Sequence, residues 1–203
     1  KLHNAKYRFG FTGTLDGSKT HKWVLEGLFG ECEQVTKTDD LIKEGYLSKF
    51  RIKVLLCKHA PQHFESYHDE MEYLVEHKGR NNLIKNLVND LEGNTLVLFN
   101  YVEKHGEPLY ELINNIIDPE RKLFFVHGAT EVEDREEVRQ ITETESNAVI
   151  VASYGTFSTG INIKRLHNII FASPSKSRIR NLQSIGRVLR TVSYTHLTLP
   201  TMS

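Results

Sequence analysis

Thr95-Leu96-Val97-Leu98-Phe99-Asn100 decides the fold together with a second stretch, Ala148-Val149-Ile150-Val151-Ala152-Ser153. Each is a short, uninterrupted apolar run that ends on a polar residue. Strands that are buried on both faces of a sheet read as continuous apolar runs, whereas half-exposed strands alternate. Similar runs occur at residues 122–126 and 167–172. The sequence therefore predicts several parallel strands at the centre of the domain.

Stretches with helical periodicity separate these runs. The predicted helices span residues 20–30, 62–78, 82–91, 104–117, 131–145 and 177–190, and the predicted strands span residues 7–12, 47–59, 95–100, 122–126, 148–153 and 167–172. Residues 34–46 read as a polar connection. From residue 95 the order is strand, helix, strand, helix, strand, strand, helix. Such alternation predicts an α/β fold, in which a parallel sheet carries helices on both faces.

The overall composition excludes several classes of protein. Acidic and basic residues number 26 each, so the neutral total argues against wholesale coating of nucleic acid, although a local basic patch stays possible. No apolar run approaches a membrane span, and residues 1–10 do not resemble a secretory signal, so we expect no membrane partner and a cytoplasmic location. Cys32 and Cys57 lack ligand spacing and no His-Glu-x-x-His pattern occurs. We therefore predict no metal site.

The residues that follow the predicted strands are the first candidates for a functional site. In parallel sheets ligands bind at the carboxyl ends of the strands. The loops after Asn100, Val126, Ser153 and Ala172 are therefore expected to meet at one edge. Trp23, Tyr46 and Tyr67 could stack on bases, but we expect them to pack against the core, as single aromatic residues usually do.

Two neighbouring segments contain residues suited to phosphate chemistry. Gln183, Arg187 and Arg190 are spaced so that they lie on one face of a helix. Guanidinium groups stabilise charge that is spread over phosphoryl oxygens, although an Arg-x-x-Arg pair alone is typical of a solvated face. Residues 152–162 follow a strand and are rich in Ser, Thr and Gly, which suits a loop that presents backbone N–H groups to phosphates. An ordinary polar turn is the alternative.

These two segments resemble motifs V and VI of superfamily-2 nucleic-acid helicases. Three further elements resemble the family in the same order: Phe11-Thr12-Gly13-Thr14 resembles motif III, Leu96–Asn100 resembles motif IV, and Val126-His127-Gly128, followed by Arg135, resembles the His-Gly element. The resemblance covers roughly residues 7–190. It implies a RecA-like second motor domain, preceded by the last strand of the first motor domain.

The resemblance also implies an activity, cofactors and partners. The chain is expected to be the C-terminal half of an ATP-dependent DNA helicase or translocase, with ATP and Mg²⁺ as cofactors and the DNA backbone as partner. Action on branched recombination or repair intermediates follows from a greater likeness to phage recombination helicases in Phe29-Gly30, Val151–Gly155, Phe157–Ile161 and Ile185–Arg190. A restriction-type or repair translocase and a non-hydrolysing nucleic-acid-binding module are the alternatives. The oligomeric state is left open.

The family motifs assign a role to each matching residue. The resemblance implies catalysis by Arg190 as arginine finger with Arg187 and Gln183, and nucleotide binding by Gly160, Asn162, Arg187 and Arg190. It implies coupling of hydrolysis to domain movement by Thr12, Gly13 and Thr14, and nucleic-acid binding by Asn100, His127, Gly128, Ser158 and Thr159. Lys176 and Arg178, with Arg180, could extend the DNA path, or could be a solvated helix start. Asn162 replaces an Asp that binds the ribose in many relatives.

Two nucleotide-binding motifs of the family do not occur in the sequence. There is no Gly-x-x-x-x-Gly-Lys-Ser/Thr loop and no Asp-Glu box, so ATP and Mg²⁺ would be held mainly by a first motor domain. We expect residues 1–46 to be the end of that domain and a linker, and residues 47–191 to form an incomplete C-terminal RecA-like domain. This fragment alone is expected to be inactive. Residues 192–203 lack helical periodicity and resemble translated adapter sequence, so we expect a non-native tail.

Overall fold

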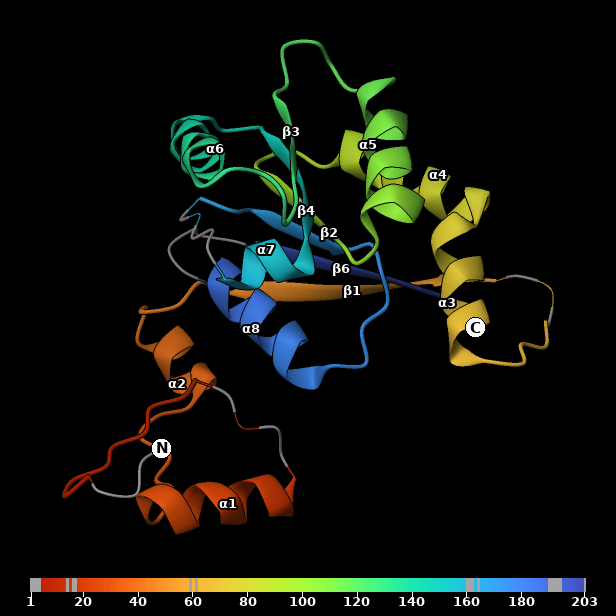
Figure 1. Cartoon of the computed structure of the whole chain (residues 1–203). Helices are drawn as coiled ribbons and strands as arrows, with labels where there is room; N and C mark the ends of the chain where they lie inside the picture. The colour runs from red at the N-terminus through yellow and green to blue at the C-terminus, as the bar shows by residue number, and fades with distance from the viewer. Residues whose placement is uncertain are drawn as a thin grey trace.

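Among the residues that the structure describes, six strands form one sheet in the order β1-β6-β5-β2-β4-β3, and every neighbouring pair is parallel (Figure 1). The computed structural model describes residues 5–13, 15, 18–58, 60, 62–159, 163, 165–189 and 195–202, without the side chains of residues 158, 159, 188 and 195–202. The predicted parallel α/β fold is therefore confirmed.

The helices and strands follow the predicted order closely. The elements are α1 (Lys19–Phe29), α2 (Thr38–Lys43), β1 (Phe50–Cys57), α3 (Tyr67–Glu76), α4 (Lys78–Asp90), β2 (Thr95–Phe99), the π-helical turn η1 (Val102–Gly106), α5 (Glu107–Asn114), β3 (Leu123–Val126), α6 (Val132–Thr144), β4 (Val149–Ser153), α7 (Tyr154–Thr159), β5 (Asn168–Phe171), α8 (Arg178–Val188) and β6 (Thr195–Met202).

The three central strands are buried over their whole length. Leu96 of β2 is in register with Ile150 of β4 and with Ile169 of β5, so alternate residues form rows across the sheet. These rows build two apolar layers, one on each face, because successive side chains of a strand point to opposite sides. Burial on both faces explains why the strands read as unbroken apolar runs.

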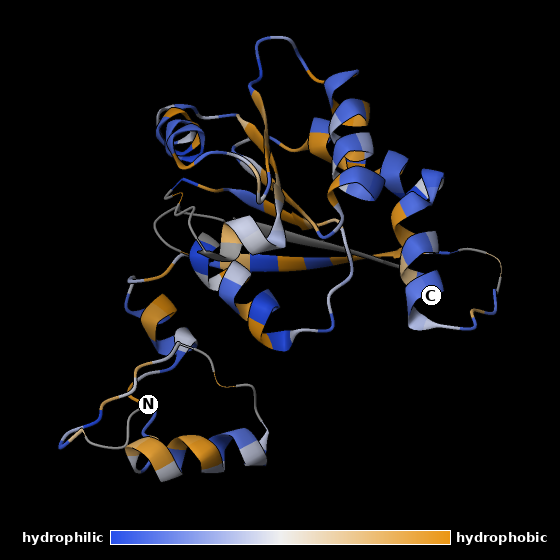
Figure 2. Cartoon of the chain, in the orientation of Figure 1, coloured by the Kyte–Doolittle hydropathy of each residue, from blue (hydrophilic) through white to orange (hydrophobic). Residues whose placement is uncertain are grey.

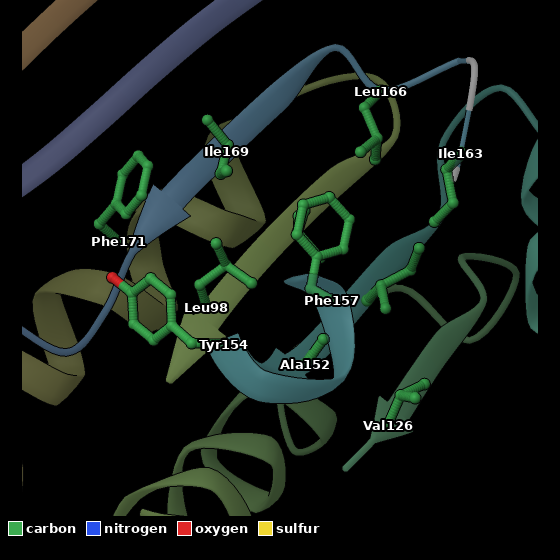
Figure 3. Close-up of a cluster of buried hydrophobic side chains, with 11 residues drawn as sticks. Leu98, Val126, Ala152, Tyr154, Phe157, Ile163, Leu166, Ile169 and Phe171 are labelled. Atoms are coloured by element: carbon green, nitrogen blue, oxygen red, sulfur yellow. The ribbon is translucent and has the colours of Figure 1, made fainter. Parts of the chain in front are cut away.

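Different helices cover the two apolar layers. The first layer is completed by Tyr154 and Phe157 of α7 (Figure 3). Val138 of α6 and Ile185 of α8 pack at its margin. The second layer is completed by residues of α4 and α5, including Ile84. The hydrophobic strands lie between these helices, whose outer residues are largely hydrophilic (Figure 2). The site-bearing helices α7 and α8 therefore rest directly on the sheet.

A buried asparagine joins the amino ends of three strands. Asn94 is fully buried, and its Nδ2 donates to the carbonyl oxygens of Thr142, Glu145 and Arg165 at 2.8–2.9 Å. Its Oδ1 accepts the N–H of Ala148 at 2.8 Å. Because these partners lie at the end of α6 and before β4 and β5, one amide group fixes the register at this edge.

Two glycines permit close approaches that a larger residue would block. Gly93 has φ +87°, and a Cβ there would lie 2.8 Å from the ring of His167. A Cβ on Gly106 would lie 2.5 Å from the ring of Phe99, which is fully buried in β2. Only glycine lets the chain pass at both places without displacing buried atoms.

The N-terminal segment differs from its prediction. The predicted strand at residues 7–12 is wrong, since no strand forms in residues 5–13, where Tyr7, Phe9 and Phe11 are largely exposed. A strand needs a neighbour for its backbone hydrogen bonds, and here the segment lies beside α1, away from the sheet (Figure 1).

Three other elements of the structure differ from those predicted from the sequence. The short helix α2 occupies part of the predicted polar connection. The predicted helix at 104–117 begins as the π-helical turn η1. The predicted elements do not include β6, which residues 195–202 form between β1 and β5. That position pairs backbone groups of both neighbours, which would otherwise lack partners. The non-native origin of this tail stays a prediction.

We predict that Asn94→Ala lowers the free energy of unfolding by about 3 kcal/mol, because buried carbonyl and N–H groups lose their partner. Urea unfolding followed by circular dichroism measures the change. Asn115→Ala is the matched control, because Asn115 is exposed, and it should change the free energy by less than about 0.5 kcal/mol. Equal effects of the two substitutions would contradict the role given to Asn94.

Candidate nucleotide and nucleic-acid interface

The carboxyl ends of β2, β3, β4 and β5 meet at one edge of the sheet, because these strands are parallel and adjacent. Asn100 follows β2, His127 follows β3, α7 follows β4, and the segment from Ala172 to Ser177 follows β5 and leads into α8. The prediction that these four connections come together is confirmed. Their arrangement determines which candidate residues can act on one ligand.

The predicted loop after β4 is a short helix. The Ser153 hydroxyl accepts the N–H of Thr156 at 3.3 Å and lies 2.8 Å from its hydroxyl. This is the bond of a helix N-cap, so α7 begins directly at Tyr154 and the expectation of a loop over residues 154–159 is wrong. Ser158 and Thr159 lie in the last turn of α7, and their side chains are outside the described set.

Helix α8 carries the described residues of motif VI. Ser177 caps its N-terminus by accepting the N–H of Arg180 at 3.3 Å. Gln183 is exposed, and Arg187 is half-buried one turn later. The Arg187 guanidinium lies 5.8 Å from the ring centroid of Phe157 in α7. Motifs V and VI, about twenty residues apart in the sequence, are therefore neighbours in the structure.

Several predicted nucleotide-side residues cannot be placed. Gly160, Asn162 and Arg190 lie outside the described residues, as does Thr14 of the coupling motif. Thr12 and Gly13 are exposed, and the N-terminal segment to which they belong lies away from the sheet (Figure 1). The structure thus brings Gln183 and Arg187 to the edge occupied by α7, but it does not bring the described coupling residues there.

The His-Gly element is a turn that an arginine holds closed. The His127 N–H donates to the Thr130 hydroxyl at 3.0 Å. Arg135 of α6 donates from Nε to the Thr130 carbonyl at 2.8 Å and from Nη2 to the Gly128 carbonyl at 3.0 Å. Gly128 itself is exposed and His127 is half-buried. Arg135 therefore positions the turn, and Gly128 stays exposed to solvent.

Asn100 and the segment after β5 are bonded to each other. The Asn100 N–H donates to the Ser173 hydroxyl at 3.0 Å, and Asn100 Nδ2 donates to the Pro174 carbonyl at 3.1 Å. The predicted nucleic-acid-binding residue Asn100 therefore uses its amide nitrogen inside the protein. Lys176 and Arg178, both exposed, lie just beyond this joint.

A buried histidine that the sequence analysis missed completes this joint. Asn81 Nδ2 donates to the Val75 carbonyl at 2.8 Å, while its Oδ1 lies 3.2 Å from His105 Nε2. Because Oδ1 can only accept, Nε2 carries the proton of the neutral imidazole. His105 Nδ1 then accepts from the Ser173 hydroxyl at 2.8 Å, and the oxygen of that hydroxyl accepts the N–H of Asn100. The donor and the acceptor of each hydrogen bond from Asn81 through His105 and Ser173 to Asn100 are therefore assigned.

Two further buried polar groups surround this histidine. Arg80 is 2% exposed and donates from Nη2 to the Ala172 carbonyl, and burial lowers the pKa of its guanidinium to about 10. The Tyr154 hydroxyl donates to the Ser173 carbonyl at 3.0 Å, and burial raises the pKa of that phenol. The first residue of α7 is thus connected to the same network as His105.

Burial, together with the nearby Arg80 guanidinium, lowers the pKa of His105 to about 3. An imidazole in an unfolded chain titrates near 6.5. Between these values the unfolded state binds more protons than the folded state, so stability rises with pH and is lost as pH falls from about 6.5 towards 3.

We therefore predict that lowering the pH from 7 to 5 destabilises the wild-type chain by about 2 kcal/mol more than it destabilises His105→Gln. Urea unfolding at the two pH values measures the difference. His68→Gln, which removes an exposed imidazole, should keep the wild-type dependence on pH. The same dependence in His105→Gln and wild type would show that His105 is not held neutral.

Among the described helices, none combines the length and apolar character that a membrane crossing needs. Within the same part of the chain, no group of three or more His, Cys, Asp or Glu residues could hold a metal ion.

Comparisons with known proteins agree with the fold. The ATP-dependent DNA helicase uvsW of Enterobacteria phage T4 is 33% identical over 198 residues, which cover 93% of this chain and 38% of that protein. The crystal structure of T4 UvsW matches with a TM-score of 0.64 at 29% identity, covering 90% of this chain and 36% of that one. The chain thus spans well under half the length of this phage relative.

More distant structures share the fold alone. The yeast DEAD-box splicing factor Prp28 matches with a TM-score of 0.59 at 15% identity, covering 91% of this chain and 35% of that one. The ATP-dependent Type ISP restriction-modification enzyme LlaBIII, bound to DNA, matches with a TM-score of 0.59 at 20% identity, covering 87% of this chain and 13% of that one.

Residues 79–192 match the family described as helicase conserved C-terminal domain. Because that match covers more than half of the sequence, this chain belongs to the helicase C-terminal domain family, with the RecA-like fold of superfamily-2 helicases.

Proposed function

We propose that this chain provides the second motor domain of an ATP-dependent DNA helicase or translocase that acts on branched recombination or repair intermediates. Membership of the helicase C-terminal domain family and the 33% identity to a phage DNA helicase support the proposal. The observation that carries it is the position of Arg187, whose guanidinium lies against Phe157 of α7 at the carboxyl edge of the sheet. DNA as substrate, and branched DNA in particular, rest on the likeness to the phage helicase.

The nucleotide side of the proposed site consists of α7, the residues that follow it, and α8. We assign Arg190 as the arginine finger, Arg187 as a second phosphate contact, and Gln183 as the group that orients the attacking water. Gly160 and Asn162 would lie near the nucleotide. No Asp or Glu follows Glu145 in the sequence, so these segments offer no carboxylate that would repel a polyphosphate. The residues present fit ATP for that reason.

The remaining nucleotide contacts belong to a first motor domain in this proposal. The nucleotide loop and the Asp-Glu box, which hold ATP and Mg²⁺ in this family, do not occur in the sequence. The bound Mg²⁺ would neutralise charge that develops on the phosphates during transfer. Residues of this chain would bind and orient the γ-phosphate from the opposite side. We therefore propose that the chain by itself does not hydrolyse ATP.

The nucleic-acid side of the proposed site is the row of connections after β2, β3 and β4. The turn at His127-Gly128, the joint at Asn100 and the end of α7 with Ser158 and Thr159 would hold the sugar-phosphate backbone of one strand. Phosphate contacts of this kind fix the position of a strand without reading its sequence. A motor that moves along DNA needs sequence-independent binding, which supports this assignment.

We predict that Arg190→Ala, in an enzyme that joins this chain to a first motor domain with the nucleotide loop, lowers the kcat of ATP hydrolysis by about 10³-fold. The physical reason is the loss of a cation that stabilises charge on the transferred phosphoryl group. The affinity for single-stranded DNA should change by less than about 2-fold. Steady-state ATPase assays and fluorescence anisotropy measure the two quantities.

Arg165→Ala is the control for this experiment. Arg165 is an exposed arginine at the amino edge of the sheet, where its Nη1 donates to the Glu143 carbonyl at 3.2 Å. Its removal should leave the kcat within about 2-fold of wild type. Equal losses of ATPase activity and DNA affinity in Arg190→Ala would refute the assignment of the arginine finger.

A further inference from the structure

The charge of this neutral chain is unevenly distributed along the sequence. Residues 146–203 contain seven Lys and Arg residues and no Asp or Glu. Three of these cations, Lys176, Arg178 and Arg180, lie between the end of β5 and the first turn of α8, and all three are exposed. We call these three residues the basic segment. The segment is a local concentration of positive charge at the carboxyl edge of the sheet.

The cations of this segment lie where a helix disfavours them. Arg178 and Arg180 occupy the first turn of α8, which contains no acidic residue. The N-terminus of a helix carries partial positive charge, so cations there are unfavourable and anions are favourable. Within the described part of the chain, none of the three cations of the basic segment forms an ion pair. A bound anion would relieve this repulsion and would also meet free backbone N–H groups.

The backbone that carries the basic segment is fixed rather than free. Asn100 Nδ2 donates to the Pro174 carbonyl at 3.1 Å, and Asn181 Nδ2 donates to the Ser175 carbonyl at 3.0 Å. The Ser177 hydroxyl caps α8. These bonds hold the backbone that carries the three cations next to Asn100, so an anion can bind there without the cost of ordering a loop.

An exposed aromatic ring lies beside the basic segment. Tyr67 is the first residue of α3 and is 47% exposed, and Lys176 Nζ lies 3.8 Å from the centroid of its ring. The expectation that Tyr67 packs against the core is therefore wrong. Ser66 and Asp69 form a reciprocal capping box that fixes the start of α3 and occupies the nearby Asp69 carboxylate. A fixed ring next to clustered cations is the combination found where proteins hold single-stranded nucleic acid.

We propose that Tyr67 and the basic segment form a contact for single-stranded nucleic acid. The arginines and the N-terminus of α8 bind consecutive phosphates, and the ring of Tyr67 stacks on a base. The proposal rests on the proposed helicase function and extends the strand path beyond the motif residues, from Asn100 towards α3. Stacking on a base requires no particular sequence, which suits a translocating motor.

Fluorescence anisotropy with this chain tests the contact. The probes are a fluorescein-labelled single-stranded dT12 and an abasic oligonucleotide with the same number of phosphates. Tyr67→Ala is expected to weaken binding of dT12 by about 10-fold and to leave binding of the abasic probe within about 2-fold. Tyr67→Phe, which keeps the ring, should bind both probes like wild type. Tyr46→Ala is the matched control, because Tyr46 is 72% exposed and lies outside the contact.

The proposed phosphate contacts are tested separately, by the affinity for both probes and by its dependence on salt concentration. The double variant Arg178→Ala with Arg180→Ala should weaken binding of both probes to the same degree. It should also make the slope of log K against log salt concentration shallower by about 1.4, because two phosphate contacts are lost. Circular dichroism confirms that each variant is folded before the comparison.

The possible failures are distinguishable. If wild type binds neither probe at low salt, the proposed nucleic-acid function fails and the stacking contact fails with it. If wild type binds both probes but Tyr67→Ala binds them like wild type, or weakens both equally, the stacking contact is overturned while the proposed function stands. A loss in Tyr67→Phe as large as the loss in Tyr67→Ala also overturns stacking by the ring.

Discussion

The hydroxyl of Ser173 accepts the N–H of Asn100 and donates to the ring of His105, so the ends of β2 and β5 are joined in the protein interior. The carbonyl of the same residue accepts the hydroxyl of Tyr154, which begins α7 after β4. Burial makes an unpaired polar group costly, so this network has few alternative arrangements. The positions of the three connections at the carboxyl edge therefore depend on one serine and its neighbours.

This constraint connects the two sides of the proposed site. Tyr154 belongs to the helix that is proposed to approach the nucleotide, and Asn100 belongs to the joint that is proposed to contact the nucleic acid. Asn100 donates to the Ser173 hydroxyl and Tyr154 donates to the Ser173 carbonyl, so the two residues are linked by direct hydrogen bonds through one buried serine. The basic segment begins three residues after Ser173 and thus shares the same anchor. We infer that the network keeps nucleotide and strand contacts in a fixed relation within this domain.

The sequence predicted β2, β3, β4 and β5 and the meeting of their ends, because strands that are buried on both faces are unbroken apolar runs, as in Thr95–Asn100. It also predicted Gln183 and Arg187 on one helix face, from spacing alone. Other features depend on partners far along the chain. His105 lies in a polar stretch typical of a solvated helix, and its burial arises from residues 24 and 68 positions away. The α7 helix had a local cue, the N-cap pair Ser153 and Thr156, which the Ser- and Gly-rich composition obscured.

We propose that the carboxyl edge of the sheet is the ligand-binding edge of this domain. Two-dimensional ¹H–¹⁵N NMR of this chain, titrated with a short single-stranded DNA, tests it most directly. If ligands bind at the carboxyl edge, shifted amide signals will cluster at Asn100, at residues 127–130 and at residues 173–180. Signals of Gly93, Asn94 and His167, at the amino edge, should not move. Shifts confined to the amino edge, or scattered over both edges alike, would contradict binding at the carboxyl edge.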